Sequence, residues 1–242
     1  MVLTDKKMEF FLEQVECLKN RYDELHLKYR QGDVYLVGNL EFKCALEQET
    51  ITDNYIVEIQ FPFDYLLRPP AIKEIGGRIP RNVDHHVNPD HTLCLGPPLQ
   101  ILRQFRKDST ILGCIEKLAI PKLCWHSYNQ IHPDNPLTAY SHGDIGIADY
   151  RKEVDLQEVY FEIFETKKLC VVLGLLEIIV TKVYHNNLSC PCKSGKILGD
   201  CHGKLLQSVV TMPYLKVTHL AQDYWYLKDK YRIQKRRRRQ PK

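Results

Sequence analysis

The passage between Tyr55 and Pro70 constrains the fold of this chain more than any other part of the sequence. From Tyr55 to Phe61, apolar side chains alternate with more polar ones, which is the period of a β-strand that buries one face. Pro62, Pro69 and Pro70 then remove backbone donors that a central strand would need. The sequence therefore predicts a sheet strand that stops at Phe61 and gives way to irregular chain.

Other segments place this strand in an α+β fold. Apolar residues at steps of three and four predict an amphipathic helix from about Thr4 to Tyr29, which Gly32-Asp33 ends. Turns are expected at Gly38-Asn39 and Thr52-Asp53-Asn54. The strands expected to form an antiparallel meander are Val34–Val37, Leu40–Leu46 and Tyr55–Phe61, and a separate short strand, Ala71–Ile75, can follow the Pro-rich passage. Helices are expected from Ser109 to Pro121, Ala148 to Phe164 and Thr166 to Tyr184.

Composition excludes several classes of protein. With 44% hydrophobic and 26% charged residues, the 242-residue chain is typical of a globular protein rather than a disordered or fibrous one. Its longest apolar run, residues 170–176, falls short of the ~20 residues of a membrane span. Because the charged N-terminus is unlike a secretory signal, we expect a cytoplasmic location, with the nine cysteines reduced.

The positive charge is concentrated at the C-terminus. The run Lys235–Arg239 and Lys242 supply six positive charges, so residues 1–234 carry a net charge of −2 although the whole chain carries +4. Such a basic tail, residues 235–242, is usually a solvated segment, and its alternative role is to bind phosphate backbones. Aromatic residues do not interleave with it, so nucleic-acid binding is not the expected function.

Residues 76–108 contain four prolines and three glycines and predict a long irregular segment, which in an ordered domain is usually functional. Within it, His85, His86, Asn88 and His91 precede Cys94. A thiolate is a nucleophile, nearby histidines can activate it, and an asparagine amide can hold an oxyanion. The alternative for a cysteine between two leucines is a small buried hydrophobic residue.

The order of these features resembles the ubiquitin-conjugating enzyme family over about residues 5–165. The resemblance rests on Phe61–Pro70, similar to the strand-to-Pro-Pro passage of that fold, and on His86-Val87-Asn88 ahead of Leu93-Cys94-Leu95. It implies a UBC-like fold in which Cys94 carries a thioester, Asn88 stabilises the oxyanion and His86 shapes the loop. Val87 stands where the family has proline, and the spacing from asparagine to cysteine is shorter than in eukaryotic members.

The stretch Leu137–Tyr150 looks like the His-Gly-containing region of divergent prokaryotic conjugating-enzyme-like proteins, which implies a bacterial origin. Here His142 could act as a base near the cysteine or simply precede the turn at Gly143. For His85 and His91 the sequence likewise leaves a catalytic and a solvated role as alternatives. Trp125 and Tyr128 are expected to be core or groove residues.

A second group of cysteines lies near the C-terminus, where two thiols are followed by a thiol and an imidazole across a Gly-containing loop. These are zinc ligands by type and number, and four protein ligands close the site, so the predicted Zn²⁺ is structural. The spacing resembles the SEC-C motif, which implies either docking of a partner or closure of the C-terminal end of the domain. The expected ligands are Cys190, Cys192, Cys201 and His202, in a helical module of residues 166–234 that follows a conjugating domain of residues 1–165.

The resemblance implies an acyltransferase: Cys94 would receive a partner protein's activated C-terminus and pass it to a lysine or another nucleophile. The chain has no Gly-rich phosphate loop, so a separate activating protein is expected. Stand-alone bacterial members resemble components of antiphage (CBASS-type) operons, which implies a cGAS/DncV-like nucleotidyltransferase as the protein handled. The alternatives are a non-catalytic UBC-like module that grips a partner's C-terminal tail, and a zinc-containing adaptor that uses its basic tail on nucleic acid.

Overall fold

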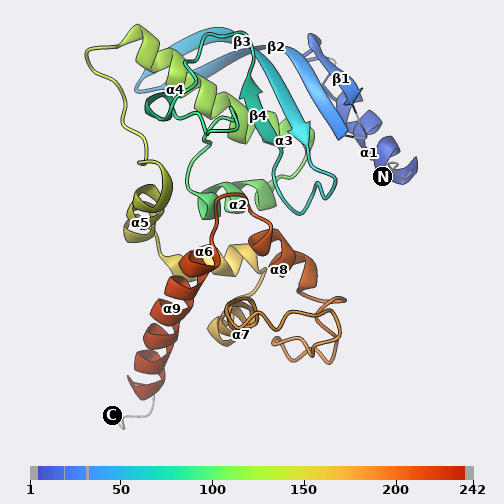
Figure 1. The fold of residues 1–242 in the computed structure, drawn as a ribbon, viewed down its shortest axis with the longest axis vertical. Coiled ribbons are helices and arrows are strands. Elements are labelled where there is room, and N and C mark those ends of the chain that lie inside the picture. Colours follow the sequence, from blue (N-terminus) through green and yellow to red (C-terminus); the bar gives the residue numbers. More distant parts are fainter. Residues whose placement is uncertain (1–4, 19, 31–32, 238–242) are drawn as a thin grey trace. The chain divides into compact units, whose positions relative to one another are not determined.

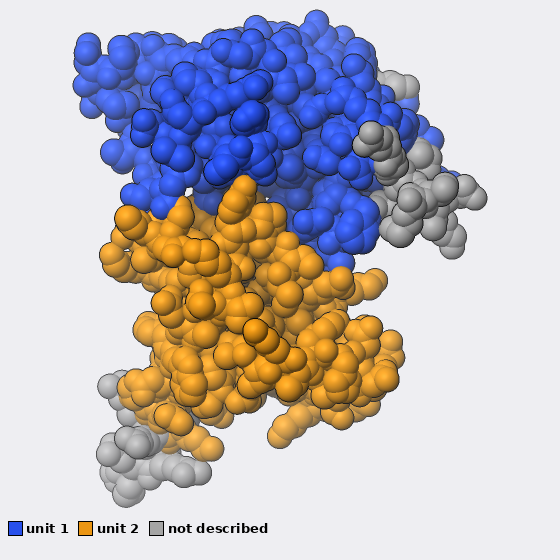
Figure 2. Space-filling model, in the orientation of Figure 1, with its two compact units in different colours: residues 1–96, 104–142 blue, residues 97–103, 143–242 orange. Residues whose placement is uncertain are grey.

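The computed structural model describes residues 5–18, 20–30 and 33–237, so the predictions for Thr4 and for the last part of the basic tail lie outside it. Two compact units share this chain (Figure 2): unit 1 is residues 1–96 and 104–142, and unit 2 is residues 97–103 and 143–242. The division into a conjugating domain of residues 1–165 and a helical module of residues 166–234 stays a prediction. In the part of the chain that is described, no helix has both the length and the apolar character of a membrane span.

Unit 1 is built on a four-stranded antiparallel sheet in the order β1-β2-β3-β4 (Figure 1), which confirms the α+β class and the meander. Along β3, Tyr55, Val57, Ile59 and Phe61 are buried, because the period-two alternation turns all four toward one face. The strands are β1 (Leu25–Arg30), β2 (Asp33–Leu46), β3 (Glu49–Phe61) and β4 (Ala71–Glu74).

The expected first helix is too long. Helix α1 ends at Glu16, and Leu25–Arg30 is strand β1, which pairs with β2 from Leu25↔Gly38 to Arg30↔Asp33. Leu25 and Tyr29 fit a helical stripe, but Leu25–Arg30 also alternates at period two, and pairing with a neighbouring strand decides between the two patterns.

The two turns expected inside the meander are also wrong. Gly38-Asn39 lies inside one continuous strand, β2, and Thr52–Asn54 lies inside β3. A Cβ at Gly38 would come within 1.8 Å of the Glu24 carbonyl oxygen, so glycine is required there for close approach rather than for a turn. The real turn is at Glu47-Gln48, where both residues have positive φ.

The helices of unit 1 also differ from expectation. The irregular segment contains helix α2, and Thr110 rather than Ser109 caps the next helix, with its side chain accepting from Gly113 N. Pro121 does not end that helix but lies in the first turn of α4, where its missing N–H costs little. Bounds are α1 (Asp5–Glu16), η1 (Val83–His85), α2 (Pro98–Lys107, shared by both units), α3 (Ile111–Cys114), η2 (Ile115–Ala119, a π-helical turn) and α4 (Ile120–Ile131).

Helix α4 packs against β2 and β3, and a disulfide between Cys44 of β2 and Cys124 joins it to the sheet. This corrects the expectation that all nine cysteines are reduced. The two Cα atoms are 6.5 Å apart, within the range that a disulfide spans, because the helix crosses the strand at this point. The cytoplasmic location stays a prediction.

Unit 2 is helical, and its centre is the apolar helix α7, which packs against α6, α8 and α9. The expected helix 148–164 is two helices, because the Asp155 side chain accepts from Gln157 N and starts α6. Asp223 of α9 is buried and pairs with Arg151 at 2.7 Å and with the Tyr160 hydroxyl at 2.7 Å. Bounds are α5 (Gly143–Glu153), α6 (Leu156–Ile163), α7 (Leu169–Val180, shorter than expected), α8 (Gly203–Val210) and α9 (Val217–Arg237).

Candidate active site and metal centre

The loop between β4 and α2 holds Cys94 through its backbone. Leu93 N donates to Ile72 O of β4 at 2.7 Å, and Cys94 N donates to His86 O at 2.7 Å. His86 itself has a positive φ and closes the short helix η1 by donating to Val83 O. These bonds fix the residues beside the thiol, which stays partly exposed as a reactive thiol must.

Two imidazoles lie beside the thiol. The Sγ of Cys94 and one ring nitrogen each of His86 and His142 lie within 4.8 Å of one another, and the two rings stack at 4.4 Å. Burial and, second, the charge of Lys122 lower the pKa of His86 to about 4, and the same two causes lower the pKa of His142. Both imidazoles are therefore mainly neutral at pH 7 and can accept a proton.

Helix α4 brings a third kind of group to the site. Lys122 is 8% exposed, and its Nζ lies 4.0 Å from the centre of the Trp125 ring, which in turn contacts the His86 ring at 5.0 Å. One helical turn beyond Lys122, His126 is buried, and its Nε2 has no hydrogen-bond partner among the described residues. Burial lowers the pKa of Lys122 to about 8 and, with the charge of Lys122, that of His126 to about 3.

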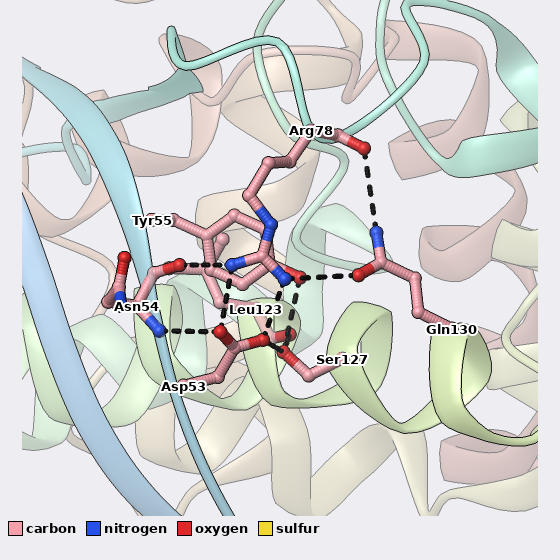
Figure 3. A network of polar contacts seen from close by, with 7 residues as sticks. All are labelled: Asp53, Asn54, Tyr55, Arg78, Leu123, Ser127 and Gln130. Atoms are coloured by element: carbon pink, nitrogen blue, oxygen red, sulfur yellow. Dashed lines mark hydrogen bonds and ion pairs between the residues drawn. The ribbon is translucent and has the colours of Figure 1, made fainter.

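A polar network on the sheet side of α4 fixes this helix in place (Figure 3). The Arg78 guanidinium makes two bonds to the Asp53 carboxylate, at 2.8 and 2.9 Å, and lies 4.2 Å above the Tyr55 ring. Ser127 of α4 donates to the same carboxylate at 2.6 Å. The bonds from Arg78, with the one from Ser127, lower the pKa of Asp53 to about 2.

The segment that carries His142 is tied to α4 as well. Trp125 Nε1 donates to Leu137 O at 3.1 Å, and Leu137 N donates to the Asn129 side chain at 2.7 Å. Trp125 thus contacts Lys122, His86 and the connection to His142 at once. Tyr128, by contrast, is buried against His132 and is a core residue.

Three other candidates have different surroundings. The Asn88 amide donates to Thr92 Oγ1 at 3.0 Å, and Asn88 N donates to Thr92 O, so this side chain stabilises the turn before Cys94. His91 and His85 are exposed, and the latter bonds to Asn82 at 2.8 Å. The structure therefore groups His86 and His142 with Cys94, and leaves His85 and His91 outside that group.

A thiol and two imidazoles are also three of the groups that bind transition metals. The buried Lys122 opposes that use, because its charge acts on Cys94, His86 and His142 and would repel a second cation in a poorly solvated place. The positive charge of Lys122 favours a negatively charged group at this place instead. The arrangement suits an oxyanion.

The second group, in unit 2, could bind a metal ion. One ligand atom each from Cys190, Cys192, Cys201 and His202 lies within 4.8 Å of the others. The His202 Nδ1 atom is 3.2 Å from Cys190 Sγ and 3.1 Å from Cys201 Sγ. Four side-chain donors of these types, this close together, match the tetrahedral set that structural zinc takes.

The loop backbone shapes this group and seats it on α7. Cys190 N donates to Lys196 O at 3.0 Å, and Lys193 and Gly195 take positive φ between the first and second pairs of donors. A Cβ at Gly174 of α7 would come within 2.6 Å of the Pro191 side chain, so the loop packs on the helix where a side chain is missing.

Sequence reasoning missed Lys122 and His126. Both lie on the apolar stripe that continues from Ile115 and Leu118, and a lysine inside such a stripe is an unusual sign of a buried charge. A proline at position 121 predicts that the helix, and with it the apolar stripe, ends before Lys122.

No family model, no curated protein and no solved structure matches this chain.

Proposed function

We propose that this chain is a ubiquitin-conjugating-like acyltransferase that carries a partner protein's C-terminus as a thioester on Cys94. The observation that carries the proposal is the partly exposed thiol within 4.8 Å of two imidazoles, next to a buried lysine. The helix, meander and cysteine loop follow one another in the order of a UBC-like fold, and this order adds support.

The reaction has two acyl transfers. In the first, the Cys94 thiolate attacks an acyl carbonyl presented by an activating protein, a C–S bond forms and the activating group leaves. In the second, an acceptor amine attacks the thioester carbonyl, a C–N bond forms, the C–S bond breaks and Cys94 leaves as thiolate. His142 would take the amine proton, because its Nε2 is buried without a hydrogen-bond partner among the described residues.

The resemblance to antiphage (CBASS-type) proteins makes a cGAS/DncV-like nucleotidyltransferase the proposed acyl donor. The test is intact mass spectrometry of the chain purified from its own host without reductant, with Cys94→Ser and Cys170→Ser in parallel. We expect a protein-sized adduct on the wild type and on Cys170→Ser, removed by neutral hydroxylamine, and a hydroxylamine-resistant ester or no adduct on Cys94→Ser.

Hydroxylamine separates a thioester from a mixed disulfide, which reductants also cleave, and Cys170 is an exposed cysteine of unit 2. A partner that co-purifies without any adduct, equally on wild type and Cys94→Ser, would overturn the proposal in favour of a binding module that grips a C-terminal tail.

For the group in unit 2 we propose structural Zn²⁺, held by Cys190, Cys192, Cys201 and His202. The donor types and the close seating of the loop on α7 at Gly174 support a metal that closes the end of this unit. When bound, zinc would supply folding energy and no reaction step. Elemental analysis of the purified chain, expected to give about one zinc per chain, tests the metal's identity.

A further inference from the structure

Helix α4 carries two buried polar side chains that lack hydrogen-bond partners. Lys122 is 8% exposed and His126 is 4% exposed, and they lie on one face of the helix because they are four residues apart. Across the described residues, the Lys122 ammonium forms no hydrogen bond or ion pair, and the His126 Nε2 atom has no hydrogen-bond partner. Buried polar groups are nearly always paired, since leaving them unpaired costs free energy. Two such groups on one face therefore indicate a binding site.

Aromatic rings lie against these two groups. The Nζ atom of Lys122 is 4.0 Å from the centre of the Trp125 ring, and the His126 ring is 4.9 Å from the same ring. The His86 ring contacts Trp125 from the loop after β4, at 5.0 Å. A ring face attracts the ammonium, but it does not replace the hydrogen bonds that the three N–H donors of a lysine can make.

The opposite face of α4 is fixed to the sheet. Cys124 forms the disulfide to β2, and Ser127 donates to Asp53 of β3 (Figure 3). Successive residues are about 100° apart around a helix, so these two anchors lie on the other side of α4 from Lys122 and His126. The lysine therefore keeps its place beside the ring of Trp125, and its exposed part gives a small solute access to the ammonium.

The charge of the two groups decides which ligand fits. Burial lowers the pKa of Lys122 to about 8 and, together with the charge of Lys122, that of His126 to about 3, so at pH 7 the lysine is charged and the imidazole is neutral. One positive charge in a poorly solvated place matches one negative charge, whereas a dianion would keep an uncompensated charge. A carboxylate has a single charge and two oxygens that accept hydrogen bonds from an ammonium.

We propose that Lys122 and His126 form a binding site for a carboxylate, which accepts hydrogen bonds from the lysine beside the Trp125 ring. The proposal goes beyond acyl transfer, because it assigns a ligand site that does not depend on a thioester at Cys94. The carboxylate belongs either to a free small acid or to the C-terminal residue of a polypeptide, and the test separates these two sources.

The indole N–H signals in a ¹H–¹⁵N NMR spectrum report on this site. The chain has two tryptophans: Trp125 lies against Lys122, and Trp225 is exposed in unit 2, where its ring lies 4.9 Å from the ammonium of Lys228. We would titrate the full chain with sodium acetate at pH 7, with sodium chloride holding the ionic strength constant. Acetamide, which has the shape of acetate without its charge, and inorganic phosphate are titrated in parallel. The Trp225→Phe chain assigns the two signals.

We expect acetate to shift the Trp125 signal with a dissociation constant of about 1–10 mM, as suits a ligand of so few atoms, and to leave the Trp225 signal in place. Lys122→Met should weaken acetate binding by at least about tenfold, because it removes the charged donor. Lys117→Met is the matched control, since this exposed lysine pairs with Asp108, and it should leave the binding unchanged. Acetamide should give no shift, and phosphate should bind more weakly than acetate.

Three results would overturn the proposal: no saturable shift with acetate, equal shifts with acetate and acetamide, or equal acetate binding by wild type and Lys122→Met. The first two need no variant, so they cover the case in which Lys122→Met does not fold. N-acetyl-diglycine and its amide then identify the source. If the free acid binds more tightly than acetate and the amide does not bind, the site takes a polypeptide C-terminus; if acetate binds at least as tightly, it takes a free small acid. Absence of a thioester adduct would count only against the proposed function.

Discussion

The Cys94 site and the Cys190–His202 group both combine thiols with imidazoles, but their members come from the chain in different ways. The metal group takes its four donors from 13 consecutive residues of one loop. The thiol site collects His86, Cys94, Lys122 and His142 from three segments, and each depends on bonds made elsewhere in unit 1. Local spacing therefore predicts the first group, whereas only the fold assembles the second.

The two sites also differ in charge. A buried lysine lies at the thiol site, whose histidines have lowered pKa values, so the site favours an anion. The Cys190–His202 group has four soft or borderline donors and favours a cation. The same residue types can thus serve as a nucleophile's surroundings or as a metal cage, depending on what is buried beside them.

Removing one metal donor should separate the behaviour of the two sites most clearly. Cys192→Ser should reduce bound zinc from about one ion per chain to background and strongly destabilise unit 2, since structural zinc contributes on the order of 10 kcal/mol in small zinc peptides. Elemental analysis measures the zinc content, and thermal unfolding measures the stability. Cys94→Ser should keep both the metal and the melting temperature; a zinc content that falls with Cys94→Ser instead would show that the sites are misassigned.

A smaller effect is expected at the anchor of α4. The pKa of Asp53 is lowered to about 2, so its pairing stabilises the fold above pH ~4 and the stabilisation is lost as pH falls toward 2. Asp53→Asn should cost about 2.5 kcal/mol in urea unfolding at pH 7. The difference in unfolding free energy between Asp53→Asn and wild type should shrink at pH 3.

Asp149→Asn is the matched control for the Asp53 experiment, because Asp149 pairs with Lys152 on the surface and should cost well under 1 kcal/mol. The anchor variant should also change Cys94 alkylation while zinc content stays constant. Constant alkylation would mean that the thiol site does not depend on this network.

The buried imidazole of the thiol site predicts acid sensitivity. Burial lowers the folded pKa of His126 to about 3, while the unfolded value is about 6.5, so the unfolded state gains a proton first as pH falls below 6.5. Wild type should therefore lose about 2 kcal/mol between pH 7 and pH 5 from this residue, and His126→Phe should remove that loss. Unfolding in urea at both pH values checks it. His26→Phe, at an exposed position of β1, should leave the pH dependence as it is; an identical slope in His126→Phe would contradict the assignment.

A substitution at Gly174 tests how closely the metal loop lies on α7. Gly174→Ala adds a Cβ 2.6 Å from the Pro191 side chain, and the overlap should outweigh the gain in helix propensity by about 1 kcal/mol. Thermal unfolding of the zinc-loaded chain measures it. The closest atom is the Pro191 Cβ, so Pro191→Gly in the same chain should relieve the overlap. If Gly174→Ala alone is stabilising, the loop lies farther from the helix.

The sequence patterns succeeded where structure depends on neighbours along the chain. The alternation from Tyr55 to Phe61 predicted β3, and the short spacing of Cys190 to His202 predicted a metal-binding group. These patterns failed where a contact with a residue far along the chain decides which secondary structure forms or which side chains meet. Leu25–Arg30 became a strand because β2 lies beside it, and Lys122 entered the thiol site because α4 continues past Pro121. The pairing of Cys44 with Cys124 depends on the same packing of α4 across the sheet.

The disulfide has a topological consequence for the thiol site. It joins residues 80 positions apart, and the covalent ring that it closes contains Cys94, His86 and Lys122. The exposed residues 81–85 lie inside this ring, where a protease would find accessible backbone. A single cut there would leave both fragments attached, so the nicked chain would migrate as one species without reductant and as two with it.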